Sequence, residues 1–121
     1  MTRDQKFRQA AVAYAHVGLL YEGAAIAMWR RDLLPTRFGP AWVWLVLGAG
    51  IVAFVVWGLW KWQNVWFARV VWVIHALRVP TLITGAFFPP AVQKMPPAFY
   101  GAALVVVVIN LWMLARAGWD V

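Results

Sequence analysis

The chain has 121 residues, of which 64% are hydrophobic and 12% charged, whereas about a quarter of the residues in an ordinary soluble domain are charged. With 10 Trp and no Cys, this composition excludes a water-soluble globule, a disulfide scaffold and a Cys-based metal site. The net charge of +7 does not indicate a nucleic-acid partner, because Lys and Arg stand mostly singly or in pairs at the ends of apolar runs. Such positions suit anionic lipid headgroups, and we expect a polytopic membrane protein.

Four apolar segments predict one all-α integral membrane domain over residues 1–121. They are Ala10–Trp29, Ala41–Trp60, Val65–Phe88 and Ala98–Ala115. Each is long enough, or nearly so, to cross a hydrocarbon core of about 30 Å, and each must be helical because a backbone in lipid has to satisfy its own hydrogen bonds. We therefore expect four transmembrane helices in an up-down bundle.

The ends and connections of these segments follow from their polar residues. The first segment contains His16 and Glu22, which are atypical of a signal peptide, so we expect a retained span. Residues 30–40 carry prolines and charges typical of a surface loop. The connection Lys61–Asn64 is so short that it predicts an antiparallel hairpin, and residues 89–97, bounded by prolines, should form a stiff loop.

Pro80 interrupts the third segment. A helix from Val65 that stopped before Pro80 would cover only about 22 Å, which is too short to span the bilayer core. We expect a helix that is kinked at Pro80 and continues through Gly85, with neighbouring groups satisfying the freed carbonyl. The alternative is a helix broken at Pro80 whose second half lies at the interface.

Tryptophan and basic residues predict how the bundle sits in the membrane. Two interfacial belts are expected at opposite faces, one of Trp29, Trp42 and Trp44 and the other of Trp60, Trp62, Trp66 and Trp119. Basic residues divide between the side of the N-terminus (Arg3, Lys6, Arg8, Lys61, Arg116) and the opposite side (Arg30, Arg31, Arg37, Lys94). The first group is the larger, and the cytoplasmic side of a membrane protein usually carries more Lys and Arg. We therefore expect both termini in the cytoplasm, in a bacterial-type inner membrane.

Two opposite charges fall at similar depths in the first and third segments. Counting from the segment starts places Glu22 about 18 Å and Arg78 about 20 Å into the bilayer. Ionisable groups in apolar spans are costly and usually have a partner, so we expect an intramembrane ion pair that fixes the register of the two helices. The alternatives are a proton or substrate site on Glu22, and an Arg78 that reaches a headgroup.

Histidines and small residues give two further expectations. His16 and His75 are candidate ligands of a haem iron or a chlorophyll magnesium, and the simpler expectation is a histidine that hydrogen-bonds at a helix contact. Helix packing is predicted at small residues and at one amide: Gly18, Gly48, Ala49, Gly50, Ala53 and Asn110. Helical spacing puts His16 on the opposite side of the first segment from Glu22.

No catalytic residues are expected, because the sequence holds no nucleophile–base pair, no paired carboxylates and no phosphate-binding loop. A small Trp-rich bundle of this kind is typical of a non-catalytic accessory or stabilising subunit of a larger membrane complex. We expect it to contact lipid, neighbouring helices or pigment, in an assembly such as a respiratory or photosynthetic complex.

The layout also resembles the small multidrug resistance exporters in chain size, in its four helices and in the single membrane glutamate of the first helix, here Glu22. The resemblance implies a homodimer in which Glu22 exchanges protons for a cationic substrate. The family's Pro-containing Ala-Tyr-Ala-x-Trp stretch in the second helix is absent, and Arg69 and Arg78 would oppose a cationic substrate. A proton-coupled exporter is the alternative function.

Overall fold

The computed structural model describes residues 1–34, 36–37 and 39–120, and every regular element in them is a helix. The elements are α1 (Arg3–Arg30), α2 (Trp42–Trp57), the π-helix η1 (Gly58–Trp62), α3 (Val65–Ala76), α4 (Val79–Phe87) and α5 (Pro97–Trp119). The helical stretches long and apolar enough to cross a membrane number 4: Arg3–Arg30, Trp42–Trp62, Val65–Phe87 and Pro97–Trp119. Pro35 and Phe38, in the first predicted connection, and Val121 lie outside the described residues.

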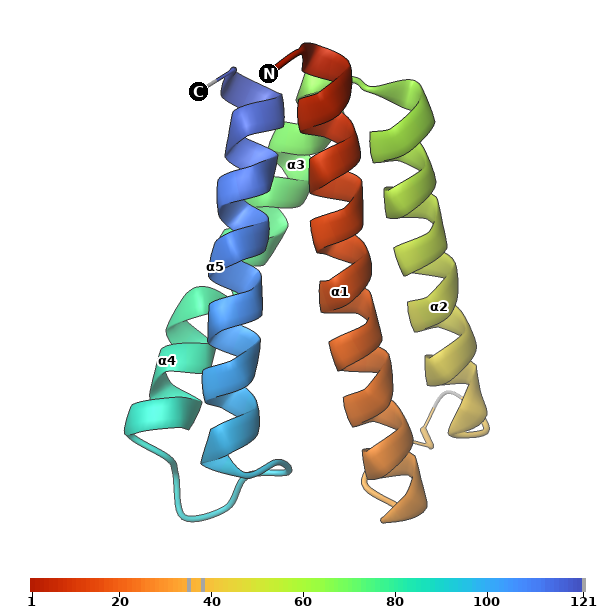
Figure 1. Cartoon of the computed structure of the whole chain (residues 1–121). Coiled ribbons are helices and arrows are strands. Elements are labelled where there is room, and N and C mark those ends of the chain that lie inside the picture. The colour runs from red at the N-terminus through yellow and green to blue at the C-terminus, as the bar shows by residue number, and fades with distance from the viewer. Residues whose placement is uncertain (35, 38, 121) are drawn as a thin grey trace.

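The helix α5 is the centre of the bundle, because it packs against α1, α3 and α4, whereas α2 packs on α1. Figure 1 shows both ends of the chain at one end of the molecule, where α1 and α5 lie close together. Toward the opposite end, α1 and α5 diverge, and α4 lies on the far side of α5 from α1 (Figure 1).

Helix α1 begins at Arg3, seven positions before the expected Ala10, because Thr2 caps it. The Thr2 hydroxyl accepts a hydrogen bond from the Gln5 backbone N–H at 3.2 Å, and the Gln5 side chain accepts one from the Thr2 N–H at 2.9 Å. This reciprocal cap satisfies two N–H groups that would otherwise lack partners. The first polar turns are therefore helical although they are too charged for a hydropathy pattern to include them.

The hairpin between the second and third spans is tighter than expected. The helix continues as η1 to Trp62, and the chain reverses at Gln63, whose φ of 50° is left-handed and whose N–H donates to the Gly58 carbonyl at 3.0 Å. Asn64 then caps α3, since its Oδ1 accepts from the backbone N–H of Trp66 at 2.8 Å and of Phe67 at 3.2 Å.

The third span is interrupted at Leu77 and Arg78, just before Pro80. The Arg78 N–H donates to the His75 carbonyl at 3.1 Å, three residues back, which is a tighter turn than an α-helix makes. Pro80 falls in the first turn of α4, where a missing N–H costs no helical hydrogen bond. The helical turn that Pro80 would disrupt is thus replaced by this irregular turn.

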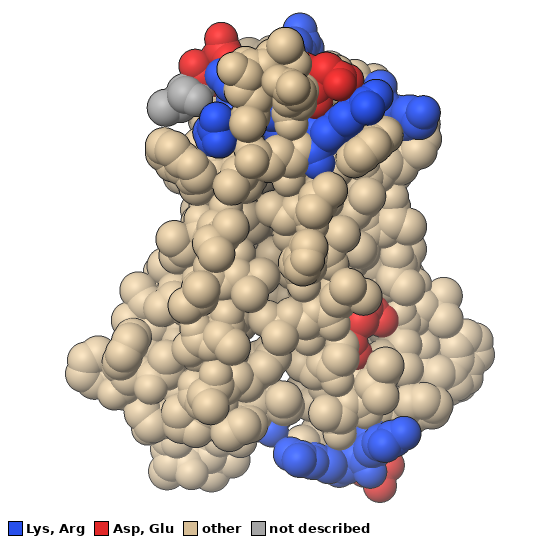
Figure 2. Space-filling model, in the orientation of Figure 1, with Lys and Arg blue, Asp and Glu red and all other residues tan. Residues whose placement is uncertain are grey.

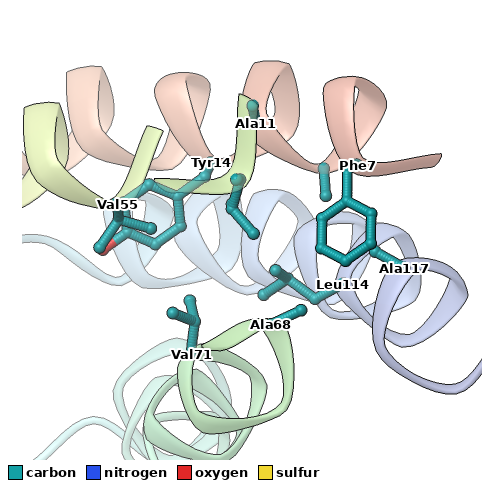
Figure 3. Packing of buried hydrophobic residues seen from close by; sticks show 10 residues of the cluster. Phe7, Ala11, Tyr14, Val55, Ala68, Val71, Leu114 and Ala117 are labelled. Carbon is teal, nitrogen blue, oxygen red and sulfur yellow. The ribbon is translucent and has the colours of Figure 1, made fainter. Parts of the chain in front are cut away.

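Buried apolar residues form two clusters along the bundle. The first lies toward the chain ends, and Figure 3 shows Phe7, Tyr14, Val55, Val71 and Leu114 converging from four helices. The second consists of Val17, Leu82, Ala103 and Val107 with partly buried aromatic neighbours. Along α5, the fully buried Asn110 falls between the residues of the two clusters.

Polar contacts between elements gather at the end where the chain termini lie. The Lys6 ammonium and the Asp120 carboxylate are 2.6 Å apart, and the Arg69 Nε donates to the Gly118 carbonyl at 2.9 Å. Further contacts there are Arg3 to the Gln63 carbonyl, Gln63 to Asp4, and Arg116 to Gln9. Figure 2 shows basic side chains at both ends of the molecule and a nearly uncharged band between them, as expected for contact with a lipid bilayer.

Candidate functional site

A small cavity of about 120 Å³, lined by both apolar and ionisable side chains, lies where α1, α2 and the third span meet. Its lining combines three apolar side chains with ionisable and glycine residues: Tyr14, Val17, Gly18, Tyr21, Glu22, Gly48, Ile51, Val52, His75 and Arg78. Five of these residues come from one face of α1, where they recur at helical spacing: Tyr14, Val17, Gly18, Tyr21 and Glu22. The cavity is the place where ionisable side chains from the first and third spans come together.

Two glycines allow α2 to approach α1 beside this cavity. A β-carbon added to Gly18 would overlap with the Val52 side chain, and one added to Gly48 would overlap with Oε1 of Glu22. Any larger residue at either position would therefore force a neighbour to move. Gly48 leaves the space in which the Glu22 carboxylate lies.

Glu22 and Arg78 line the same cavity without forming the direct ion pair expected from the sequence. The ion pairs that the structure places among its described residues are Lys6–Asp120 and Arg8–Asp4. The Arg78 guanidinium instead lies over the Tyr21 ring, 5.0 Å from the ring centroid. Arg78 lies in the irregular turn between α3 and α4, outside both helices. Counting residues along a regular helix gives its depth but not the direction in which its side chain points.

His75 is buried in the wall of the cavity. Only 3% of it is exposed, and its ring meets the Tyr14 ring edge-on, with the centroids 5.1 Å apart. Within the described part of the chain, Nδ1 of His75 has no hydrogen-bond partner. An imidazole nitrogen without a partner in an apolar interior is costly, and a cavity of this size has room for water to satisfy it.

His16 lies elsewhere, on the outer surface of α1. Its Nδ1 is 2.8 Å from the Val12 carbonyl oxygen, so this nitrogen carries the proton and donates within the helix. His16 lines an apolar groove between α1 and α5, whereas His75 lines the cavity beside Glu22. The two candidate ligands therefore do not face one shared cofactor space, and the described residues hold no cluster of three or more metal-binding side chains.

The predicted packing residues fall into two groups. Gly18 and Gly48 lie between α1 and α2, and Asn110 is fully buried although neither its side-chain nitrogen nor its oxygen bonds to another described residue. Ala49, Gly50 and Ala53 are exposed instead. The close approach that they permit is therefore not used within this chain.

The sequence does not predict the groove beside His16. It measures about 590 Å³ and is lined by Arg8, Gln9, Val12, Ala13, His16, Trp60, Val106, Ile109 and Met113. The helical spacing of Gln9, Val12, Ala13 and His16 indicates that these residues share one face of the first helix. The opposite wall of the groove comes from α5, and its position depends on how the helices pack.

Three of the tryptophans predicted to be interfacial contact arginines. The Arg8 guanidinium lies 4.8 Å from the Trp60 ring centroid, and Arg69 lies 4.7 Å from that of Trp66 and 5.4 Å from that of Trp119. Of the other belt, Trp29, Trp42 and Trp44 are exposed. Cation–π contacts of this kind keep an arginine at the edge of an apolar layer.

No protein-family model, curated protein or solved structure matches the chain. The choice between candidate functions therefore rests on the cavity, the groove and the exposed helix faces described above.

Proposed function

We propose that the protein is a non-catalytic accessory subunit of a larger membrane complex and crosses the bilayer as an up-down bundle with an interrupted third helix. The apolar helices and the uncharged band between two basic ends support this proposal (Figure 2). Little of the described chain lies outside the helices, which leaves no room there for a separate catalytic domain. The proposed host is an energy-transducing assembly, respiratory or photosynthetic.

The observation that carries the proposal is the outer α2 face, which consists of Val46, Ala49, Gly50, Ala53 and Trp57. All five residues are exposed, and a β-carbon on Gly50 would meet no atom within 4 Å. In lipid, helices associate through close packing at small residues rather than through the hydrophobic effect. Since α2 already packs on α1, the outer α2 face is free for a transmembrane helix of another subunit.

Purification of the tagged full chain from native membranes in a mild detergent tests this proposal. We expect partner subunits in fixed stoichiometry by size exclusion and mass spectrometry, and their loss when Ala49→Leu and Ala53→Leu are combined. An absorption spectrum of the same fraction tests for pigment or haem in the assembly.

The matched control is Ala102→Leu, which enlarges an exposed small residue on α5. It should leave the partners bound. The proposal fails if the chain elutes alone, or if the partners remain bound to the Ala49→Leu/Ala53→Leu variant while its helical content is unchanged.

A second candidate function is proton-coupled export by a homodimer, favoured by one observation: the Glu22 carboxylate lines a cavity without an ion-pair partner among the described residues. A carboxylate free of a counter-charge can exchange a proton. A homodimer without other subunits, whose transport in proteoliposomes is abolished by Glu22→Gln, would favour this function over the accessory subunit.

We also propose that both termini face the cytoplasm of a bacterial-type inner membrane. The chain has no Cys, so Thr2→Cys, just before α1, and Thr36→Cys, in the connection after α1, each introduce a single reactive thiol on an exposed residue. A membrane-impermeant maleimide added to intact cells should label only the Thr36→Cys variant. Labelling of only Thr2→Cys would reverse the orientation.

A further inference from the structure

The groove between α1 and α5 has the form of a site for an elongated apolar molecule. Its volume of about 590 Å³ falls within the range of about 300–1,000 Å³ typical of ligand sites. Along α1 the lining runs from Arg8 to His16, which is about 12 Å. Val12 and Ile109, on opposite walls, are 49% and 50% exposed, so the groove opens sideways to the surroundings of the bundle.

One end of the groove carries positive charge. The Arg8 side chain is 49% exposed and lies over the Trp60 ring, and its Nε is 3.2 Å from an Asp4 oxygen. Asp4 thus neutralises part of the charge of Arg8. Arg116 adds a second charge at this end, because its Nη1 donates at 3.2 Å to Oε1 of the groove residue Gln9.

The wider surroundings of that end are also basic. Lys61 follows Trp60 and is exposed, whereas Lys6 is already paired with Asp120. Since the termini end of the bundle has more basic than acidic side chains, a negatively charged group would be attracted there. An apolar groove that ends in an interfacial Trp and a cationic cluster matches a molecule with an acyl chain and an anionic headgroup.

We propose that this groove binds one anionic phospholipid, with its phosphate at Arg8 and one acyl chain along Val12, Ala13, Val106 and Ile109. Planar guanidinium groups bind phosphate through paired hydrogen bonds, and the indole of Trp60 holds the Arg8 side chain at headgroup level. The site is formed by α1, α5 and Trp60 of η1, and none of the five residues of the outer α2 face lines it, so it does not depend on the proposed subunit role.

Native mass spectrometry of the purified full chain tests the proposal, with phosphatidylglycerol and phosphatidylcholine of identical acyl chains as competing probes. We expect one phosphatidylglycerol to be retained per chain in preference to phosphatidylcholine. Arg8→Gln should weaken phosphatidylglycerol retention about fivefold, the effect of removing one interfacial basic residue. Arg30→Gln, which removes an exposed arginine at the other end of α1, should not.

A second pair of variants tests the groove itself, and helical content is checked for each variant by circular dichroism. Ile109→Trp places a large ring in the groove and should abolish retention, whereas Val105→Trp enlarges a 60% exposed residue outside the lining and should not. Equal retention of the two lipids, or equal losses with Arg8→Gln and Arg30→Gln, would overturn the proposal. The proposal would also be overturned if Ile109→Trp displaced a bound molecule whose retention does not depend on headgroup charge, such as a quinone or a carotenoid.

Discussion

Oε1 of Glu22 lies so close to the Cα of Gly48 that no β-carbon fits between them. The only acidic side chain within the four predicted apolar segments is therefore held against a glycine of the neighbouring helix, rather than against a cation. This contact couples the position of α2 to the position of the carboxylate, and it makes Gly48 a sensitive probe of the cavity.

Gly48→Ala should destabilise the purified chain, because the added methyl group has to displace the carboxylate. Overpacking of this kind costs about 1–3 kcal/mol. Thermal unfolding in detergent, followed by circular dichroism, measures the effect. The control is Gly50→Ala, two residues away, where nothing lies within 4 Å and a gain of up to about 1 kcal/mol is expected from lower backbone entropy. Equal effects of the two substitutions would contradict the placement of Glu22.

Arg78 should be coupled to Tyr21 more strongly than to Glu22. The guanidinium lies 5.0 Å from the Tyr21 ring centroid, and such a contact contributes about 0.5–1 kcal/mol at an exposed site. Double-mutant cycles of Arg78→Leu with Tyr21→Leu and with Glu22→Gln measure the two coupling energies. Tyr21→Phe keeps the ring and should show little coupling. A larger coupling energy with Glu22 than with Tyr21 would contradict this placement and support the ion pair that the sequence predicts.

Asn110→Leu should stabilise the chain by about 1 kcal/mol. The Asn110 amide is fully buried, and neither of its polar atoms bonds to another described residue. Replacing an unsatisfied buried polar group with an apolar group of similar shape removes a desolvation cost of about 1–3 kcal/mol. Asn64→Ala is the comparison, since losing the cap of α3 should cost about 1 kcal/mol. A loss of stability with Asn110→Leu would indicate a bound water or partner at the amide.

The Lys6–Asp120 pair should make stability depend on pH at the termini end. The hydrogen bond and the charge of Lys6 lower the pKa of Asp120 below its ordinary value of 3.8. A carboxyl whose pKa is lower in the folded state contributes stability above 3.8, and this contribution disappears as the pH falls through the folded pKa.

The melting temperature of Asp120→Asn, compared with that of the unchanged chain, checks this dependence. The difference should be present near about pH 7 and should shrink toward about pH 3. Asp32→Asn, which changes a carboxylate at the other end of α1, should show no comparable pH dependence. A difference that persists unchanged at low pH would mean that Asp120 acts through something other than its charge.

The sequence predicts the four helical spans well because lipid imposes a minimum length and an apolar composition on each of them. It misses the first turns of α1, because the cap at Thr2 and Gln5 depends on hydrogen bonds that hydropathy does not register. It predicts a kink or a break of the third span at Pro80, and the structure interrupts the helix just before this proline, at Leu77 and Arg78. The kinked continuous helix is not confirmed.

For the site, helical spacing puts His16 and Glu22 on opposite sides of the first segment, and in the structure the two side chains line different cavities. Depth counting also brings Arg78 to the level of Glu22. A single sequence does not predict the direction of the Arg78 side chain after the turn. It also does not predict that α5 forms the second wall of the groove beside His16. Both depend on the rotation of one helix against another, which many apolar side chains determine jointly.

The first and last residues of a domain are ordinarily its least ordered part. In this bundle the described residues near the two ends make specific contacts: Lys6 pairs with Asp120, and Arg3 and Asp4 hydrogen-bond with Gln63. A fluorescent protein or affinity handle fused to either terminus would therefore lie beside the contacts that connect α1 to α5 and to the hairpin between the second and third spans. Inserting such a label between residues 90 and 95, in the irregular segment before α5, would leave all of these contacts undisturbed.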